Sequence, residues 1–81
     1  MRQLITSPRQ VAEILRGRRK ALRISQQELA TKLGISQSRL STLEEDAARI
    51  TLERLILLAK LLGLELVLQD KKDAPRKKTE W

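Results

Sequence analysis

The feature that most constrains this chain is residues 25–45, SQQELATKLGISQSRLSTLEE, which contain two helix beginnings and one helix end. Ser25 is a favourable N-cap, and Glu28 three residues later completes a capping box, in which each side chain accepts from the other residue's backbone amide. Gly34 stands where a left-handed residue ends a helix at no steric cost. Ser36 then caps the next helix. The stretch therefore predicts two short helices joined by a tight turn.

The two predicted helices cover residues 26–33 and 37–45, and each has one apolar inner face at helical spacing, made of Leu29, Ala30, Leu33, Leu40 and Leu43. The outer face of the second helix carries only small or amide side chains: Gln37, Ser38, Ser41 and Thr42. An exposed helix that needs only solubility is usually filled with Glu and Lys. Glutamine, serine and threonine can instead donate to and accept from base edges in a major groove, so the pattern predicts a DNA-reading helix.

This arrangement resembles the helix-turn-helix of the phage-repressor (Cro and C1) family. The matching residues are Gln26, Glu28, Leu29, Ala30, Gly34, Ile35, Gln37, Leu40, Leu43 and Glu44. A generic helical hairpin inside a bundle is the alternative. We disfavour it because the caps, the small Ala30, the turn glycine and the polar outer face agree with one another.

Seven residues are predicted to contact DNA: Gln26, Ser36, Gln37, Ser38, Arg39, Ser41 and Thr42. The resemblance implies that Ser36, Gln37, Ser38 and Ser41 are the base-reading positions. Gln37 can bond to N6 and N7 of adenine in bidentate fashion. Gln26 resembles the family residue that meets the phosphate backbone, helped by the positive end of its helix. Arg39 and basic residues before the helix-turn-helix would add salt-dependent affinity.

The resemblance also implies a structural ion pair. In the family, an arginine at the place of Arg19 pairs with the glutamate that ends the recognition helix, here Glu44. Many relatives have glycine near the place of Arg23, and an arginine adopts a left-handed conformation only at a cost of about 1–2 kcal/mol. We therefore expect the connection before Ser25 to differ locally.

A first helix is predicted from Pro8 to Leu22. Ser7 is its N-cap, Pro8 suits the first helical position, and Gln10 completes a capping box. The residues before it, 1–6, form at most a short extended arm around two apolar side chains.

The region after the helix-turn-helix predicts a dimer. Thr51 caps a helix over residues 52–62 that is apolar nearly all round, which indicates a second buried surface. Gly63 ends it, and residues 64–70, LELVLQD, alternate as a strand does. One strand is not stable alone, so we expect it to pair with its twin in an antiparallel ribbon across a homodimer. The predicted dimerisation residues are Leu64, Leu66, Val67 and Leu68.

The chain of 81 residues allows one small domain, here residues 1–70, followed by a basic disordered tail, residues 71–81, that ends in the chain's single Trp81. The predicted fold class is all-α: a lambda-repressor-like helix-turn-helix bundle of four or five helices plus one C-terminal strand that pairs across the homodimer. Trp81 is either an unselected chain end or a partner-binding anchor, since tryptophan is enriched at binding hot spots.

Composition argues against other functions. The chain has no His, Cys or Tyr and no phosphate-binding glycine loop, so we expect no enzyme, metal site or cofactor. No apolar run nears the ~20 residues of a membrane span, and a small-molecule sensor would need a second domain. The net charge of +7 is concentrated in residues 1–24 and 71–81, which suits a polyanion. Charge alone leaves DNA, an acidic membrane and an acidic protein open.

The whole chain resembles the HipB-type antitoxins, with its leucine-rich helix, single strand and basic tail that closes in Glu80 and Trp81. The resemblance implies a bacterial, cytoplasmic, nucleoid-associated dimer that binds palindromic operators and represses its own operon. It also implies a partner, a HipA-type serine/threonine kinase toxin, on which Trp81 docks. A stand-alone phage-type or restriction–modification controller repressor is one alternative, and an interaction module that has lost DNA binding is another.

Overall fold

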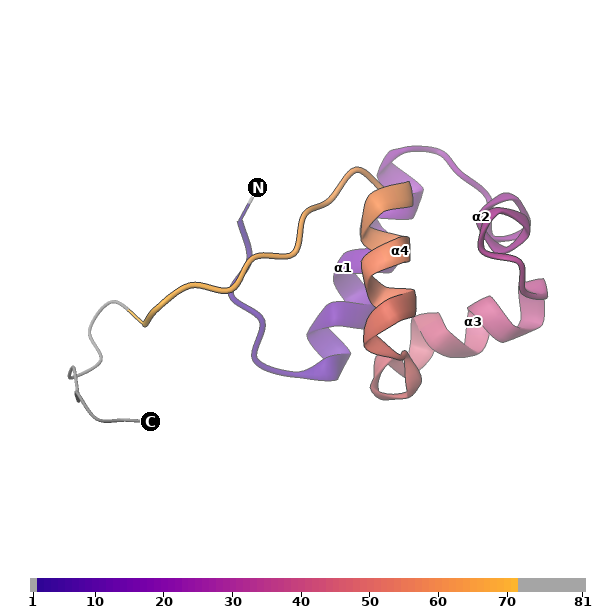
Figure 1. The fold of residues 1–81 in the computed structure, drawn as a ribbon. Coiled ribbons are helices and arrows are strands. Elements are labelled where there is room, and N and C mark those ends of the chain that lie inside the picture. Colours follow the sequence, from indigo (N-terminus) through magenta and orange to yellow (C-terminus); the bar gives the residue numbers. More distant parts are fainter. Residues whose placement is uncertain (1, 72–81) are drawn as a thin grey trace.

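The computed structural model describes residues 2–71, which form four α-helices and one short 3-10 helix. The elements are α1 (Pro8–Ala21), α2 (Gln26–Leu33), α3 (Gln37–Glu45), η1 (Ala47–Arg49) and α4 (Leu52–Leu61). In Figure 1, α4 crosses in front of α1, and α2 and α3 lie to the right of both helices. The all-helical bundle predicted from the sequence is confirmed in these residues, and the predicted ends of α1 and α4 each lie one residue too far along the chain.

Each α-helix begins with a hydroxyl that accepts a hydrogen bond from a backbone amide of the first turn. These bonds join Ser7 to Gln10, Ser25 to Glu28, Ser36 to Arg39 and Thr51 to Arg54, at 3.0–3.2 Å. The expected capping box at α1 differs in its second half, because the Gln10 side chain accepts from the amide of Thr6 and not from that of Ser7. Local sequence therefore sets all four helix beginnings.

Three helices end in one backbone motif, in which a left-handed residue follows the helix and the next residue bonds back to it. The left-handed residues are Arg23 (φ 59°), Gly34 (φ 76°) and Gly63 (φ 71°). The residues that follow, Ile24, Ile35 and Leu64, donate to carbonyls five positions earlier at 2.8–3.1 Å, and their side chains pack against the core. The turn after α1 thus has the geometry that glycine favours, and our expectation of a local difference there is wrong: the arginine itself adopts the left-handed conformation.

A cluster of buried side chains lies between the helices and consists of leucines with one alanine: Leu15, Leu29, Ala30, Leu33, Leu40, Leu58 and Leu62. Helix α1 packs on α3 and η1, while α2 packs on α3 and α4. Ala30 is 2 % exposed, and a small side chain there lets α2 approach its neighbours closely. This packing fixes α3 against the rest of the bundle.

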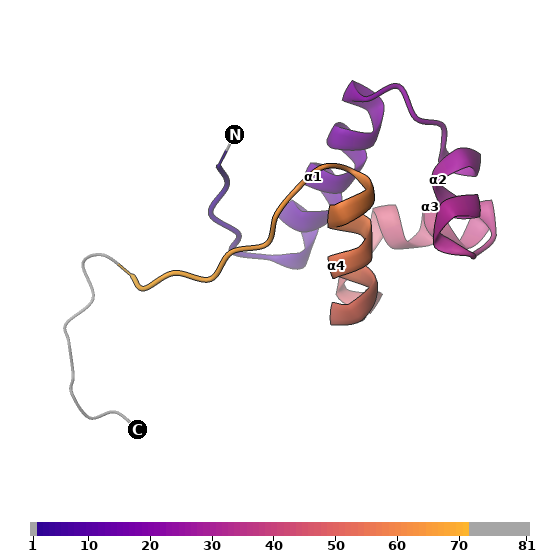
Figure 2. The ribbon, with the colours of Figure 1, turned by 45° about the horizontal axis from the view of Figure 1, so that its top comes forward.

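Two extended segments leave the bundle on the same side (Figures 1 and 2). We call residues 2–6 the N-terminal arm and residues 64–71 the C-terminal segment. The C-terminal segment has no regular secondary structure in the single chain. The strand predicted over residues 64–70 needs a partner strand, so that pairing stays a prediction. Trp81 and most of the predicted tail lie outside the described residues.

Candidate nucleic-acid interface

The turn between α2 and α3 holds the two helices in a helix-turn-helix. Gly34 donates to the carbonyl of Thr31 at 3.1 Å, and Ile35 donates to that of Ala30 at 3.0 Å. Ile35 packs against the core, while Leu40 and Leu43 bury the inner face of α3 at 1 % and 5 % exposure. The outer face of α3 is thereby turned to solvent.

The predicted base-reading residues share this outer face. Gln37, Ser38, Arg39 and Thr42 are exposed, and Ser41 is half-buried. The Thr42 hydroxyl donates to the carbonyl of Ser38 at 3.2 Å, and Ser36 is occupied as the N-cap through its acceptor oxygen. Both hydroxyl oxygens retain lone pairs for a further donor, so the face can present donors and acceptors to a base edge.

A buried ion pair connects α1 to the end of α3. Arg19 donates through Nε to Oε2 of Glu44 at 2.8 Å and through Nη2 to Oε1 at 3.2 Å. Its remaining nitrogen, Nη1, donates to the carbonyl of Ile24 at 2.9 Å. The two residues are 8 % and 4 % exposed. Burial with this fork geometry makes the pair a fixed joint between the helices.

Two further hydrogen bonds extend this pair to the surface. Gln26 donates through Nε2 to Oε1 of Glu44 at 3.0 Å, and Gln37 donates through Nε2 to Oε1 of Gln26 at 3.4 Å. We call Arg19, Glu44, Gln26 and Gln37 the polar relay. It orients the amides at the starts of α2 and α3, the two places expected to meet phosphate and base. The sequence analysis expected the pair of Arg19 with Glu44 and named Gln26 and Gln37 as DNA contacts. It missed the two bonds made by Gln26, because residue 26 lies on another helix than residues 37 and 44.

The basic residues of α1 divide by role. Arg19 belongs to the polar relay, and Arg18 donates through Nε to the carbonyl of Leu62 at 2.8 Å. Lys20 and Arg23 are exposed and Arg16 is half-buried, so these three are available for phosphate contact. Arg9, in the first turn of α1, is also exposed, and its Nε lies 3.6 Å from Oε2 of Glu13. At the end of α3, Asp46 lies 3.2 Å from Arg49 in an exposed pair.

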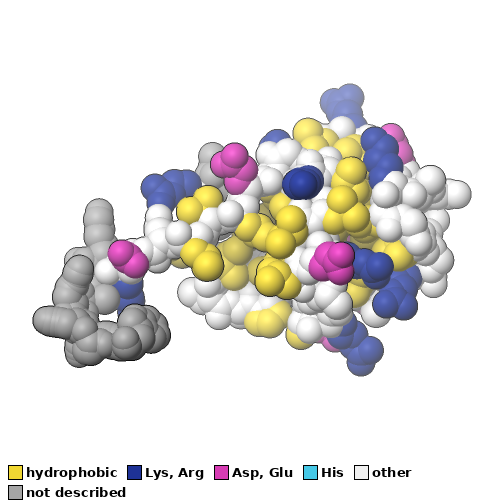
Figure 3. Space-filling model, in the orientation of Figure 1, with side chains coloured by type: hydrophobic (Ala, Val, Ile, Leu, Met, Phe, Trp, Pro, Cys, Tyr) yellow, Lys and Arg dark blue, Asp and Glu magenta, His cyan; other side chains and the backbone are white. Residues whose placement is uncertain are grey.

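Large apolar side chains gather on another face. On α4, Leu52, Ile56 and Leu57 are 69 %, 44 % and 41 % exposed. In the C-terminal segment the predicted dimerisation residues Leu66, Val67 and Leu68 are exposed, whereas Leu64 packs partly against the core of its own chain. Figure 3 shows yellow side chains running from the bundle onto this segment. Such a patch indicates an interaction surface.

Within residues 2–71, no three His, Cys, Asp or Glu side chains are grouped to hold a metal ion. None of the described helices has both the length and the apolar content that crossing a bilayer requires.

The fold and the polar face of α3 define the class: a helix-turn-helix DNA-binding protein. The family is equally plain, since the model of the helix-turn-helix family (HTH_3) matches residues 15–69 and the chain belongs to that family. It is a HipB-type member by structural likeness. The HipB chain of a structure entitled "HipB-O1-O2 complex" superposes with a TM-score of 0.75 at 33% identity, covering 85% of this chain and 100% of that chain.

One further structure and one sequence relative also resemble this chain. A chain of the "HipA-HipB-O2-O3 complex" gives a TM-score of 0.76 at 33% identity, covering 85% of this chain and 97% of that one. In sequence, this chain is 37% identical over 65 residues to the uncharacterized HTH-type transcriptional regulator y4dL of Sinorhizobium fredii (strain NBRC 101917 / NGR234). That match covers 80% of this chain and 33% of the relative, so the chain spans about a third of the curated relative's length. The chain therefore shares its helix-turn-helix domain with a transcriptional regulator and with HipB.

Proposed function

We propose that this regulator is the antitoxin of a HipBA-type operon: a homodimer that binds palindromic operators, represses its own operon and neutralises a HipA-type kinase. The observation that carries the DNA-binding part is the polar face of α3, whose first amide is oriented by the polar relay. Two copies of α3 would enter successive major grooves about 34 Å apart on one face of the DNA.

The homodimer is supported by the exposed apolar side chains of α4 and the C-terminal segment. The operator and toxin parts are supported by the structural neighbours, which are complexes of HipB with O1 and O2 and of HipB with HipA, O2 and O3. We take these O elements to be operators. In this proposal the seven residues named from the sequence contact DNA, and Trp81 contacts the kinase. The regulator acts in the bacterial cytoplasm, on the nucleoid.

The DNA-binding part is tested with the purified full chain and the promoter region of its own operon. We expect retention of the promoter fragment at concentrations where a base-scrambled fragment of equal length stays free, with footprints on two half-sites. Equal binding of both fragments would refute sequence-specific recognition.

The antitoxin part is tested by co-expression with the neighbouring kinase gene. The full chain is expected to restore growth and to co-purify with the kinase, while Trp81→Ala is expected to weaken co-purification at least tenfold, about 1.4 kcal/mol or more. DNA binding by Trp81→Ala should remain at the wild-type level. Undiminished kinase binding by Trp81→Ala would remove the tail from the proposal.

A second candidate is a stand-alone repressor without a toxin partner. It is favoured by the curated relative, which is described as a transcriptional regulator and nothing more. This candidate would be supported if the chain binds its operator but does not relieve the growth defect caused by any kinase encoded in the same genome.

A further inference from the structure

Arg18 and Arg19 are neighbours on α1 that hold two different parts of the molecule. Arg19 holds the end of α3 through Glu44. Arg18 holds the end of α4: its Nε donates to the carbonyl of Leu62 at 2.8 Å, and its Nη2 lies only 3.3 Å from where a Cβ on Gly63 would be. Helix α1 thus contacts, through Arg18, the residues at which the chain leaves α4.

The far part of the C-terminal segment is also tied back. Arg2 of the N-terminal arm donates to Oε1 of Gln69 at 2.7 Å. The arm is itself fixed to α1 through Gln10, whose amide donates to the carbonyl of Leu4 at 2.6 Å and accepts from the backbone of Thr6 at 2.8 Å. The C-terminal segment is therefore attached to α1 near both of its ends, directly and through the arm.

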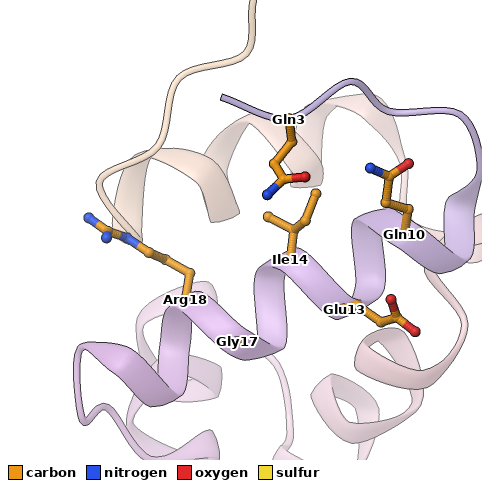
Figure 4. A pocket seen from close by; sticks show the side chains of 6 residues that line it. All are labelled: Gln3, Gln10, Glu13, Ile14, Gly17 and Arg18. Atoms are coloured by element: carbon orange, nitrogen blue, oxygen red, sulfur yellow. The ribbon is translucent and has the colours of Figure 1, made fainter. Parts of the chain in front are cut away.

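Figure 4 shows the surface hollow between these attachments, lined by Gln3, Gln10, Glu13, Ile14, Gly17 and Arg18. Within it, the Arg18 side chain points away from Ile14 and toward the ribbon where α4 passes into the C-terminal segment. Gly63, with φ 71°, supplies the turn, and Arg18 supplies a lateral contact that selects one exit direction.

We propose that Arg18 is a positioning residue for DNA recognition: it fixes the direction in which the C-terminal segment leaves α4, and thereby the half-site spacing that the dimer accepts. The inference rests on the proposed operator-binding homodimer. Its basis is that one rigid helix holds the recognition helix through Arg19 and the dimerisation segment through Arg18. Since one base pair moves a half-site by about 3.4 Å and turns it by about 34°, a change in exit direction alters which spacing fits.

The test compares two neutral substitutions in the full chain. Arg18→Gln places its Nε2 where Arg18 has Nε and can keep the bond to Leu62, whereas Arg18→Met has a similar length and no donor. Both remove one positive charge, and both residues favour helices about as well as arginine. Arg9→Gln, at an arginine of α1 whose side chain is 88% exposed, is the charge-matched control.

Affinity is measured on operators that keep the native half-site sequences. The half-sites are separated by the native spacer or by a spacer one or two base pairs shorter or longer. We expect wild type, Arg9→Gln and Arg18→Gln to share one preferred spacer. Arg18→Met should lose about three- to tenfold of that preference, the worth of one hydrogen bond, or move its optimum. Circular dichroism and sedimentation confirm that each variant is folded and dimeric.

Two results overturn the inference while leaving the proposed function intact: an unchanged spacing profile in Arg18→Met, or the same broadening in both Arg18 variants, which would indicate a charge effect. If wild type forms no dimer or prefers no operator, the proposed function fails, and the inference fails with it. A uniform loss of affinity at every spacer counts as an unchanged profile.

Discussion

The α2–α3 half of the molecule and the α4–C-terminal half differ in how many of their large or charged side chains are buried within one chain. In the first half, the carboxylate of Glu44 is buried in a pair with Arg19 of α1, and Leu29 and Leu40 are each 1 % exposed. In the second half, Leu52 and Val67 are 69 % and 70 % exposed. The side chains that pack the first half find their partners within the chain, whereas the second half leaves large apolar side chains exposed. Each prediction below tests one side of that division.

The largest effect is expected at Glu44. Glu44→Ala should lower the free energy of unfolding by about 3–5 kcal/mol, because it leaves the Arg19 charge buried without its partner. Urea unfolding measures this at one fixed protein concentration, because the apparent stability of a dimer depends on concentration. The control is Asp46→Ala, which breaks an exposed pair with Arg49 and should cost about 0–1 kcal/mol. Similar small losses in both variants would contradict a self-sufficient α2–α3 half.

The next effect concerns the apolar face of α4. Ile56→Glu should raise the dimer dissociation constant about 10- to 100-fold, because the dimer would bury a carboxylate without a partner, and an unpaired buried polar group costs at least about 1–3 kcal/mol. Helix content should be unchanged because glutamate favours helices. Sedimentation equilibrium measures the change, with Gln27→Glu at an exposed position of α2 as the control that adds the same single negative charge. A dimer as tight as wild type would place the association surface elsewhere.

A comparable or smaller effect is expected at the outer end of the polar relay. Gln37→Ala should weaken operator binding by about 1–3 kcal/mol and relax specificity at one base pair. The salt dependence of binding should stay as in wild type, because no phosphate contact is lost. Titration of operators mutated one position at a time measures both quantities, and Gln3→Ala removes an amide from the N-terminal arm as control. Uniform weakening over all operators would assign Gln37 to the phosphate backbone.

The same division explains what the sequence could predict. Helix beginnings followed from Ser7, Ser25, Ser36 and Thr51, because a cap depends on residues three positions apart. The inner and outer faces of α3 followed from helical spacing in the same way. The bond from Gln26 to Glu44 did not, since it joins residues that only the packed fold brings together. The hydrogen bonds of the predicted ribbon would join the C-terminal segments of two chains. A single chain cannot form them, so its structure does not test the ribbon.

The smallest effect lies at the boundary between α1 and the helix-turn-helix, where local preference and packing disagree. Arg23, Gly34 and Gly63 hold the same left-handed position after their helices, and Ile24 follows Arg23 into the core as Ile35 and Leu64 follow the glycines. Packing of Ile24 thus holds Arg23 in a conformation that costs a non-glycine residue about 1–2 kcal/mol. Arg23→Gly removes that strain but adds about 0.5–1 kcal/mol of chain entropy to be lost on folding.

Arg23→Gly should therefore raise the free energy of unfolding by up to about 1 kcal/mol, measured by urea unfolding at the concentration used for Glu44→Ala. The matched control is Arg23→Ala, which removes the same charge and keeps the Cβ that causes the strain, so it should give no such gain. Equal gains in both variants would mean that charge repulsion with neighbouring Lys20 and Arg19, and not backbone strain, is what arginine costs at this turn. Equal stability of wild type and Arg23→Gly would mean that the strain and the entropy cancel, and that packing of Ile24 holds the turn at no net expense.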